Sequence, residues 1–153
     1  MKYLVLGFLF LLLLSCDPAR IELVDKDFKM LHISHTRENV PDSIMPSLRD
    51  IDYSAYDLLC LGGDLDYTTS GHEETMQLWD DLFNFSNPTT LWTLGNHDVT
   101  NRILVEQFTA RPSYYSWSNE FLTVVVLDTQ LDSSRISGDQ LLFLTAVTDS
   151  ITD

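Results

Sequence analysis

The sequence predicts an α/β protein, because apolar strand-like runs alternate with segments of helical spacing. The strand-like runs lie at 28–34, 56–61 and 89–94, and the helical segments lie at 43–51, 73–85 and 102–108. The run at 56–61 is apolar almost throughout, as in a strand that is buried on both faces. The order strand, helix, strand, helix, strand indicates a sheet covered by helices.

Each helical segment is predicted by the recurrence of its apolar side chains. In the first segment they are Ile44, Leu48 and Ile51, and Pro46 suits the first turn of a helix better than its middle. In the second they are Met76, Trp79, Leu82 and Phe83.

Beyond Pro112 the pattern changes. The segments 114–118 and 121–128 read as two strands of a hairpin, joined by Asn119 and Glu120. Ser137 then stands three residues before Gln140, the spacing of a capping box that opens an apolar helix.

Residues 1–15 have the pattern of a signal peptide, with Lys2 before an apolar run that is too short to span a membrane comfortably. The run ends at Cys16 and resembles the lipobox of bacterial lipoprotein signal peptides. That resemblance implies cleavage before Cys16 and lipid attachment there; the alternative is a plain signal peptide with an accidental cysteine. We therefore expect a tether at 16–27 and a protein exported to the bacterial cell envelope and held on a membrane by acyl chains.

The composition is strongly acidic, with 9 Lys and Arg against 23 Asp and Glu. This balance argues against a nucleic-acid-binding surface and against electrostatic docking on anionic lipid. If Cys16 is lipidated, Cys60 is the one thiol left; its apolar surroundings in the sequence predict a buried structural cysteine.

Polar side chains follow two of the predicted strands. Gly63-Asp64 follows the second, and Gly95-Asn96-His97-Asp98 follows the third. If the strands are parallel, these side chains meet at one edge of the sheet. Carboxylate, amide and imidazole ligands suit Zn, Mn or Fe. The alternative for the second group is an ordinary Gly-Asn turn.

These two groups, about thirty residues apart and each after an apolar strand, resemble the calcineurin-like metallophosphoesterases. The resemblance implies a layered β-sandwich flanked by helices. It covers the amino-terminal portion of that domain, so we expect 28–153 to be a partial domain, truncated at its carboxyl end.

Carried over residue by residue, the resemblance makes Asp64 the carboxylate that bridges two metal ions and Asn96 a ligand of the second ion. His97 would lie over the substrate and either protonate the leaving oxygen or stabilise charge on the phosphate, and Asp98 would orient His97 by a hydrogen bond. The nucleophile implied is a metal-bound hydroxide.

Two departures weaken the resemblance. The family's first motif is Asp-x-His, but this chain has His35 and Arg37 at those positions. His35 could still bind a metal through nitrogen, whereas Arg37 carries a permanent charge and would repel a cation or contact the substrate phosphate. The family also supplies later histidines, including Gly-His-x-His, and this sequence has no histidine after His97.

We therefore expect a lipid-anchored phosphoesterase that hydrolyses a phosphomonoester or phosphodiester with Mn, Fe or Zn, with both metal sites or only one of them retained. The alternatives are an inactive, truncated or degenerate remnant, and an envelope lipoprotein with a structural or partner-binding role. The oligomeric state is left open.

Overall fold

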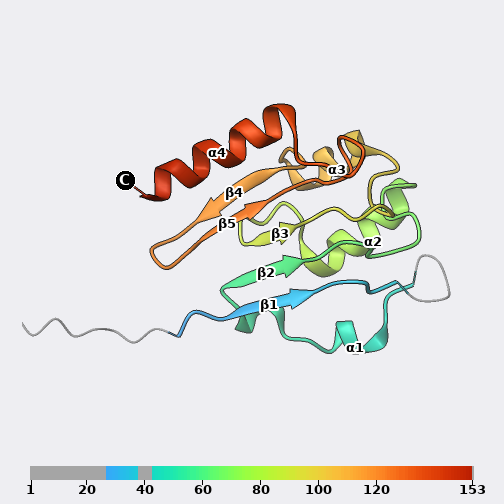
Figure 1. Ribbon diagram of the computed structural model, residues 1–153. Helices are drawn as coiled ribbons and strands as arrows, with labels where there is room; N and C mark the ends of the chain where they lie inside the picture. Colours follow the sequence, from blue (N-terminus) through green and yellow to red (C-terminus); the bar gives the residue numbers. More distant parts are fainter. Residues whose placement is uncertain (1–26, 38–42, 153) are drawn as a thin grey trace, which may run out of the picture.

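Three parallel strands form the central sheet of the computed structural model, which describes residues 27–37 and 43–152 (Figure 1). They are β1 (Met30–Ile33), β2 (Leu58–Leu61) and β3 (Thr90–Trp92), in the order β1-β2-β3. In the register, Ile33 lies opposite Leu61, which lies opposite Trp92 on its other side. The carboxyl ends of the three strands are therefore level, which brings the loops that follow them to one edge.

One face of this sheet is covered by the three helices α1 (Pro46–Arg49), α2 (Glu73–Phe83) and α3 (Arg102–Thr109). Leu59 and Leu61 of β2 point to this side and pack in a core with α2 residues such as Trp79, which is fully buried. Side chains alternate along a strand, so Leu58 points to the opposite face.

That opposite face is covered by an antiparallel hairpin, β4 (Tyr115–Ser118) and β5 (Thr123–Val126). Val126 packs there against Leu58 and Leu91. The last helix, α4 (Gly138–Thr152), runs along the outer side of the hairpin (Figure 1). The layers are thus helices, parallel sheet, hairpin and helix, which confirms the predicted α/β class and its layered arrangement.

The predicted first helix is shorter than its apolar spacing suggests. It spans Pro46–Arg49 rather than 43–51, and a separate 3-10 turn follows at Tyr53–Ala55. Met45 before the proline is extended and supplies no side-chain cap, as expected for a residue that precedes proline. Pro46 is the first helical residue, so its predicted place is confirmed.

The predicted capping box at the start of α4 is wrong. The Gln140 side chain turns away from Ser137 and binds the backbone of Asp128, whose amide donates to Oε1 at 2.6 Å. Gln140 Nε2 also donates to the Asp128 carbonyl at 3.1 Å. Asp128 is fully buried and its carboxylate is paired with Arg102 of α3. The hydrogen bonds of Gln140 to these buried backbone groups stabilise the fold more than a helix cap would. They also attach α4 to the end of β5.

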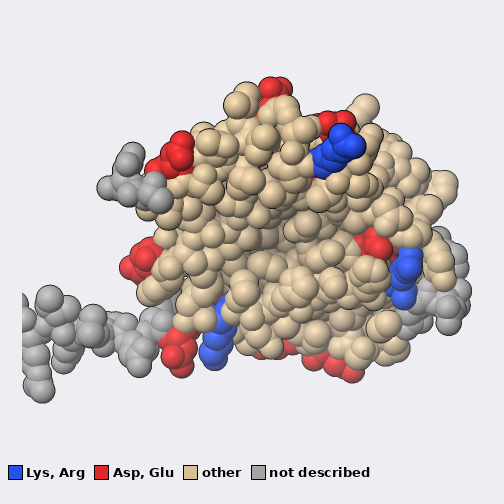
Figure 2. Space-filling view, viewed as in Figure 1, with Lys and Arg blue, Asp and Glu red and all other residues tan. Residues whose placement is uncertain are grey.

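The surface seen in Figure 2 has few charges over its middle, and most of its acidic side chains lie around the rim. Within the described part of the chain, no helix is long and apolar enough to cross a membrane. The predicted signal peptide at 1–15, Cys16 and most of the tether lie outside the described residues.

Candidate active site at the carboxyl edge of the sheet

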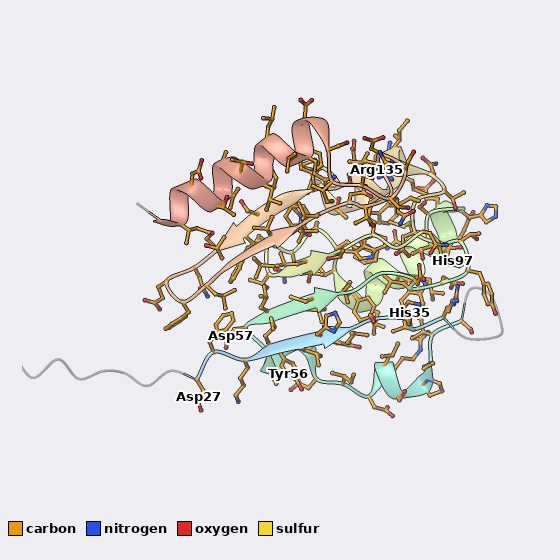
Figure 3. The ribbon with its side chains drawn as sticks, viewed as in Figure 1. Asp27, His35, Tyr56, Asp57, His97 and Arg135 are labelled. Carbon is orange, nitrogen blue, oxygen red and sulfur yellow. The ribbon has the colours of Figure 1, made fainter. Side chains whose placement is uncertain are left out.

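Backbone hydrogen bonds join the segments that leave the three parallel strands. The amide of His35 donates to the Gly63 carbonyl at 3.0 Å, and the amide of Thr93 donates to the Leu61 carbonyl at 2.8 Å. Figure 3 labels His35 and His97 at the end of the molecule toward which the strands point, and Asp57 at the opposite end. The pairing of the strands thus continues into the loops that carry the predicted site.

Two glycines allow these loops to approach each other closely. Gly63 has φ of +85°, and a Cβ there would lie 2.5 Å from the Gly95 amide nitrogen. A Cβ on Gly95 would overlap the carboxylate of Asp64. Any side chain at either position would therefore push the β2 and β3 loops apart.

Asp64 lies at the centre of the site. It is 6% exposed and has a left-handed backbone with φ of +54°. Its Oδ1 accepts a hydrogen bond from the His97 amide at 3.2 Å, and its Oδ2 lies 3.2 Å from His35 Nε2. The structure therefore brings the loops after β2 and β3 together at one edge, as the sequence predicts, and it adds His35 from the loop after β1.

Asp98 is fully buried and holds the Asp64 loop. Its Oδ2 accepts from the amides of Asp64 at 2.7 Å and Gly95 at 2.8 Å. Its Oδ1 accepts from the Leu65 amide at 3.2 Å and from the Thr69 hydroxyl. Burial raises the pKa of Asp98 above its usual range, and these four hydrogen bonds oppose that rise.

The predicted hydrogen bond from Asp98 to His97 is not formed, because the four donors above already occupy the Asp98 carboxylate. Instead, His97 Nδ1 lies 2.7 Å from the carbonyl oxygen of Tyr67. A carbonyl oxygen can only accept, so Nδ1 carries the hydrogen and Nε2 is the ring nitrogen free to exchange a proton. The Tyr67 ring also meets the His97 ring edge-on, at 6.4 Å between centroids.

The remaining candidate side chains are more accessible. Asn96 is exposed in the turn before His97, and the side chain of His35 is 66% exposed. Arg37 is partly buried, with its guanidinium carbon 5.7 Å from the centre of the Tyr67 ring. The site is thus open to solvent on the side of these residues.

A comparison with protein families matches residues 31–146 to the calcineurin-like phosphoesterase model. The chain belongs to the calcineurin-like phosphoesterase family. The matched residues form the amino-terminal portion of the domain and include all three strand ends of the site. No curated protein matches this chain in sequence.

Calcineurin-like phosphoesterases normally bind divalent metal ions, and each ion needs several donor atoms at one place. His35 and Asp64 supply one nitrogen and one carboxylate in contact with each other. In residues 27–37 and 43–152, no group of three or more His, Cys, Asp or Glu side chains could hold a metal ion. The donors of this segment therefore fall short of a complete metal centre, and Arg37 stands where the family's motif has a histidine.

Sequence reasoning missed the part played by Thr69. It is fully buried; its hydroxyl donates to Asp98 and accepts from the Asp66 amide at 3.0 Å. Its own amide donates to the His97 carbonyl at 3.1 Å. The available signal was the largely polar run 66–70, which begins two residues after Asp64 and is unusual for the start of a crossover to a helix.

Proposed function

We propose that this chain acts on a phosphate ester at the carboxyl edge of the β1-β2-β3 sheet and hydrolyses it with a divalent metal ion. The observation that carries the proposal is the junction of two loops, in which the buried Asp64 carboxylate accepts the His97 amide. Family membership supports the reaction class. A phosphomonoester and a phosphodiester are both compatible with an open edge.

His97 is proposed to exchange the proton of the leaving oxygen. The contact of its Nδ1 with the Tyr67 carbonyl supports this role, because it fixes the ring and leaves Nε2 for the substrate. Asp98 is proposed as a positioning residue that acts through the Asp64 loop rather than through the imidazole.

Asp64, His35 and Asn96 are the proposed metal ligands, and Mn, Fe or Zn suits this donor set. Because the described donors are incomplete, we assign no step of the reaction to the metal.

We also propose that the protein is exported and anchored by lipid at Cys16 in a bacterial envelope. Support comes from the sequence alone, where the apolar run ends at Ser15-Cys16 and polar Asp17 follows.

The test is hydrolysis of a chromogenic phosphodiester and a chromogenic phosphomonoester by the full chain, with Mn added and with EDTA. His97→Ala should lower the Mn-dependent rate by about 10²- to 10⁴-fold, the usual contribution of a general acid. Asn96→Ala should weaken the dependence on Mn. Mn-dependent rates that are unaffected by both substitutions would overturn the proposal.

A second candidate is a family member that no longer hydrolyses its ligand. Arg37 at the family's histidine position and the incomplete donor group favour it. It predicts no turnover at any Mn concentration and no bound metal by elemental analysis. The first candidate predicts Mn-dependent turnover and bound metal.

A further inference from the structure

Arg37 is fixed to the site by the residue before it. Thr36 is buried, and its hydroxyl donates to the carbonyl of Leu65 at 3.1 Å. The His35 amide is also bonded to the Gly63 carbonyl. The backbone that carries Arg37 is therefore attached at two points to the loop of Asp64.

The side chain of Arg37 lies in contact with the residues around His97. Its guanidinium is 5.7 Å from the centre of the Tyr67 ring, a cation-π contact. The same ring meets His97 edge-on, and the Tyr67 carbonyl accepts from His97 Nδ1. Arg37, Tyr67 and His97 thus form a continuous group at the edge of the sheet.

The charge of Arg37 is available to a ligand. Arg102 is paired with Asp128, and Arg111 donates to backbone carbonyls, among them that of Thr90 at 2.8 Å. By contrast, no carboxylate in the described part of the chain lies within ion-pair distance of Arg37. The nearby Asp64 carboxylate is in contact with His35.

An arginine that stacks on an aromatic ring keeps its planar fork of N–H donors, which matches two oxygens of a phosphate group. We propose that Arg37, supported by the Tyr67 ring beside His97, binds the phosphate group of the ester. This inference rests on the proposed function and deepens it: a guanidinium, rather than a metal ion held by a further ligand, supplies positive charge at this position. Phosphate binding at this group then does not require a metal ion.

The test is titration of the full chain, in detergent solution and with excess EDTA, with inorganic phosphate, followed by calorimetry. We expect measurable binding by the wild type and a loss of about 10- to 100-fold in affinity for Arg37→Gln, the range for a charge-assisted hydrogen bond. Arg37→Lys should recover only part of this loss, because it keeps the charge without the planar fork. Tyr67→Ala should weaken binding less than Arg37→Gln.

Lys29→Gln is the matched control, because it removes one positive charge at the opposite end of the sheet, where the Lys29 amide is bonded to Asp57 (Figure 3). It should bind phosphate as the wild type does. Equal phosphate affinity in Arg37→Gln and Lys29→Gln would overturn the inference, as would no binding by the wild type in EDTA.

The two proposals can fail separately. Mn-dependent hydrolysis that is lost in His97→Ala but unaffected by Arg37→Gln would leave the proposed function standing and remove this inference. Phosphate binding in EDTA that depends on Arg37, without any turnover, would support this inference and leave hydrolysis unsupported.

Discussion

At the scale of single residues, Asp98 fixes the path of the site's loops and does not form the hydrogen bond to His97 that the sequence predicts. Three backbone amides and one hydroxyl donate to its carboxylate, and two of those amides belong to Asp64 and Gly95. A buried carboxylate with this many donors sets the path of two loops at once. This explains how Asp98, which is buried behind the loop of Asp64, can define where Asp64 and His97 meet.

Replacing Asp98 by Asn tests this arrangement. The amide keeps the size of the side chain but loses acceptors for the backbone N–H groups, and we expect a loss of about 1–3 kcal/mol in the free energy of unfolding. Burial raises the pKa of Asp98, so the folded state holds this proton to higher pH than the unfolded state does. Its contribution to stability is therefore complete below the unfolded pKa and falls as pH rises through the folded pKa.

The measurement is urea denaturation of the wild type and Asp98→Asn between about pH 3.5 and 7. The wild type's advantage should be largest in acid and should narrow as pH rises. A difference between the two proteins that stays constant over this range would show that Asp98 does not titrate as burial requires.

Single-residue roles were the least predictable part of the site. Asp64 and His97 follow from strand ends and a family pattern, but the partners of Asp98 depend on how two loops cross. Thr69 and Tyr67 enter the site through contacts some thirty residues away along the chain. Contacts of this kind produce no recurring spacing in the sequence. For this reason the hydrogen-bond partner predicted for Asp98, His97, was wrong.

At the scale of elements, the site depends on how closely the loops after β2 and β3 approach. Strand periodicity placed all three parallel strands within a few residues, because buried runs are strongly patterned. Helical spacing predicted too long a helix at α1, where Pro46 is the first helical residue, and the capping-box spacing failed at Gln140, whose side chain binds the buried backbone of Asp128. In both places the surrounding fold, rather than the local sequence pattern, determines the structure.

Gly95→Ala tests the close approach directly. The added methyl group would overlap the Asp64 carboxylate, so we expect a loss of about 1–3 kcal/mol in the free energy of unfolding, as for overpacking. Hydrolysis should fall as well, because Asp64 and His97 would be pushed apart.

The matched control is Gly138→Ala at the start of α4. A Cβ there meets nothing within 4 Å, and only its φ of +53° is unfavourable. We expect this control to cost about 1 kcal/mol and to leave hydrolysis unchanged. If Gly95→Ala were no more disruptive than Gly138→Ala in thermal denaturation and activity, the loops would not be in the contact described.

At the scale of the whole molecule, the fold presents one polar edge between a helical layer and a hairpin layer. The α/β class and the layers could be predicted because alternating elements and a family pattern both point to them. The number of metal donors could not be predicted from the sequence, because it depends on side chains that come together only in the folded structure.

The proposed attachment to a membrane concerns the whole molecule, and this proposal depends on Cys16. Cys16→Ser should move the protein from the detergent phase to the aqueous phase in a detergent phase-partition experiment, because the acyl chains would be absent. Cys60→Ser is the matched control: this thiol lies partly buried against the hairpin, and its substitution should leave partition unchanged. Equal partition of the wild type and Cys16→Ser would contradict a lipid anchor at this residue.

The central claim is that the junction built around Asp64 is the active site of a phosphoesterase. The most direct test is the Mn-dependent rate of phosphodiester hydrolysis in Asp64→Asn, a substitution that suits the left-handed backbone at this position (φ of +54°) and so should preserve the fold. We predict a rate reduced to that measured in EDTA, with the thermal midpoint little changed. A folded Asp64→Asn protein that hydrolyses the ester at the wild-type rate would contradict the claim.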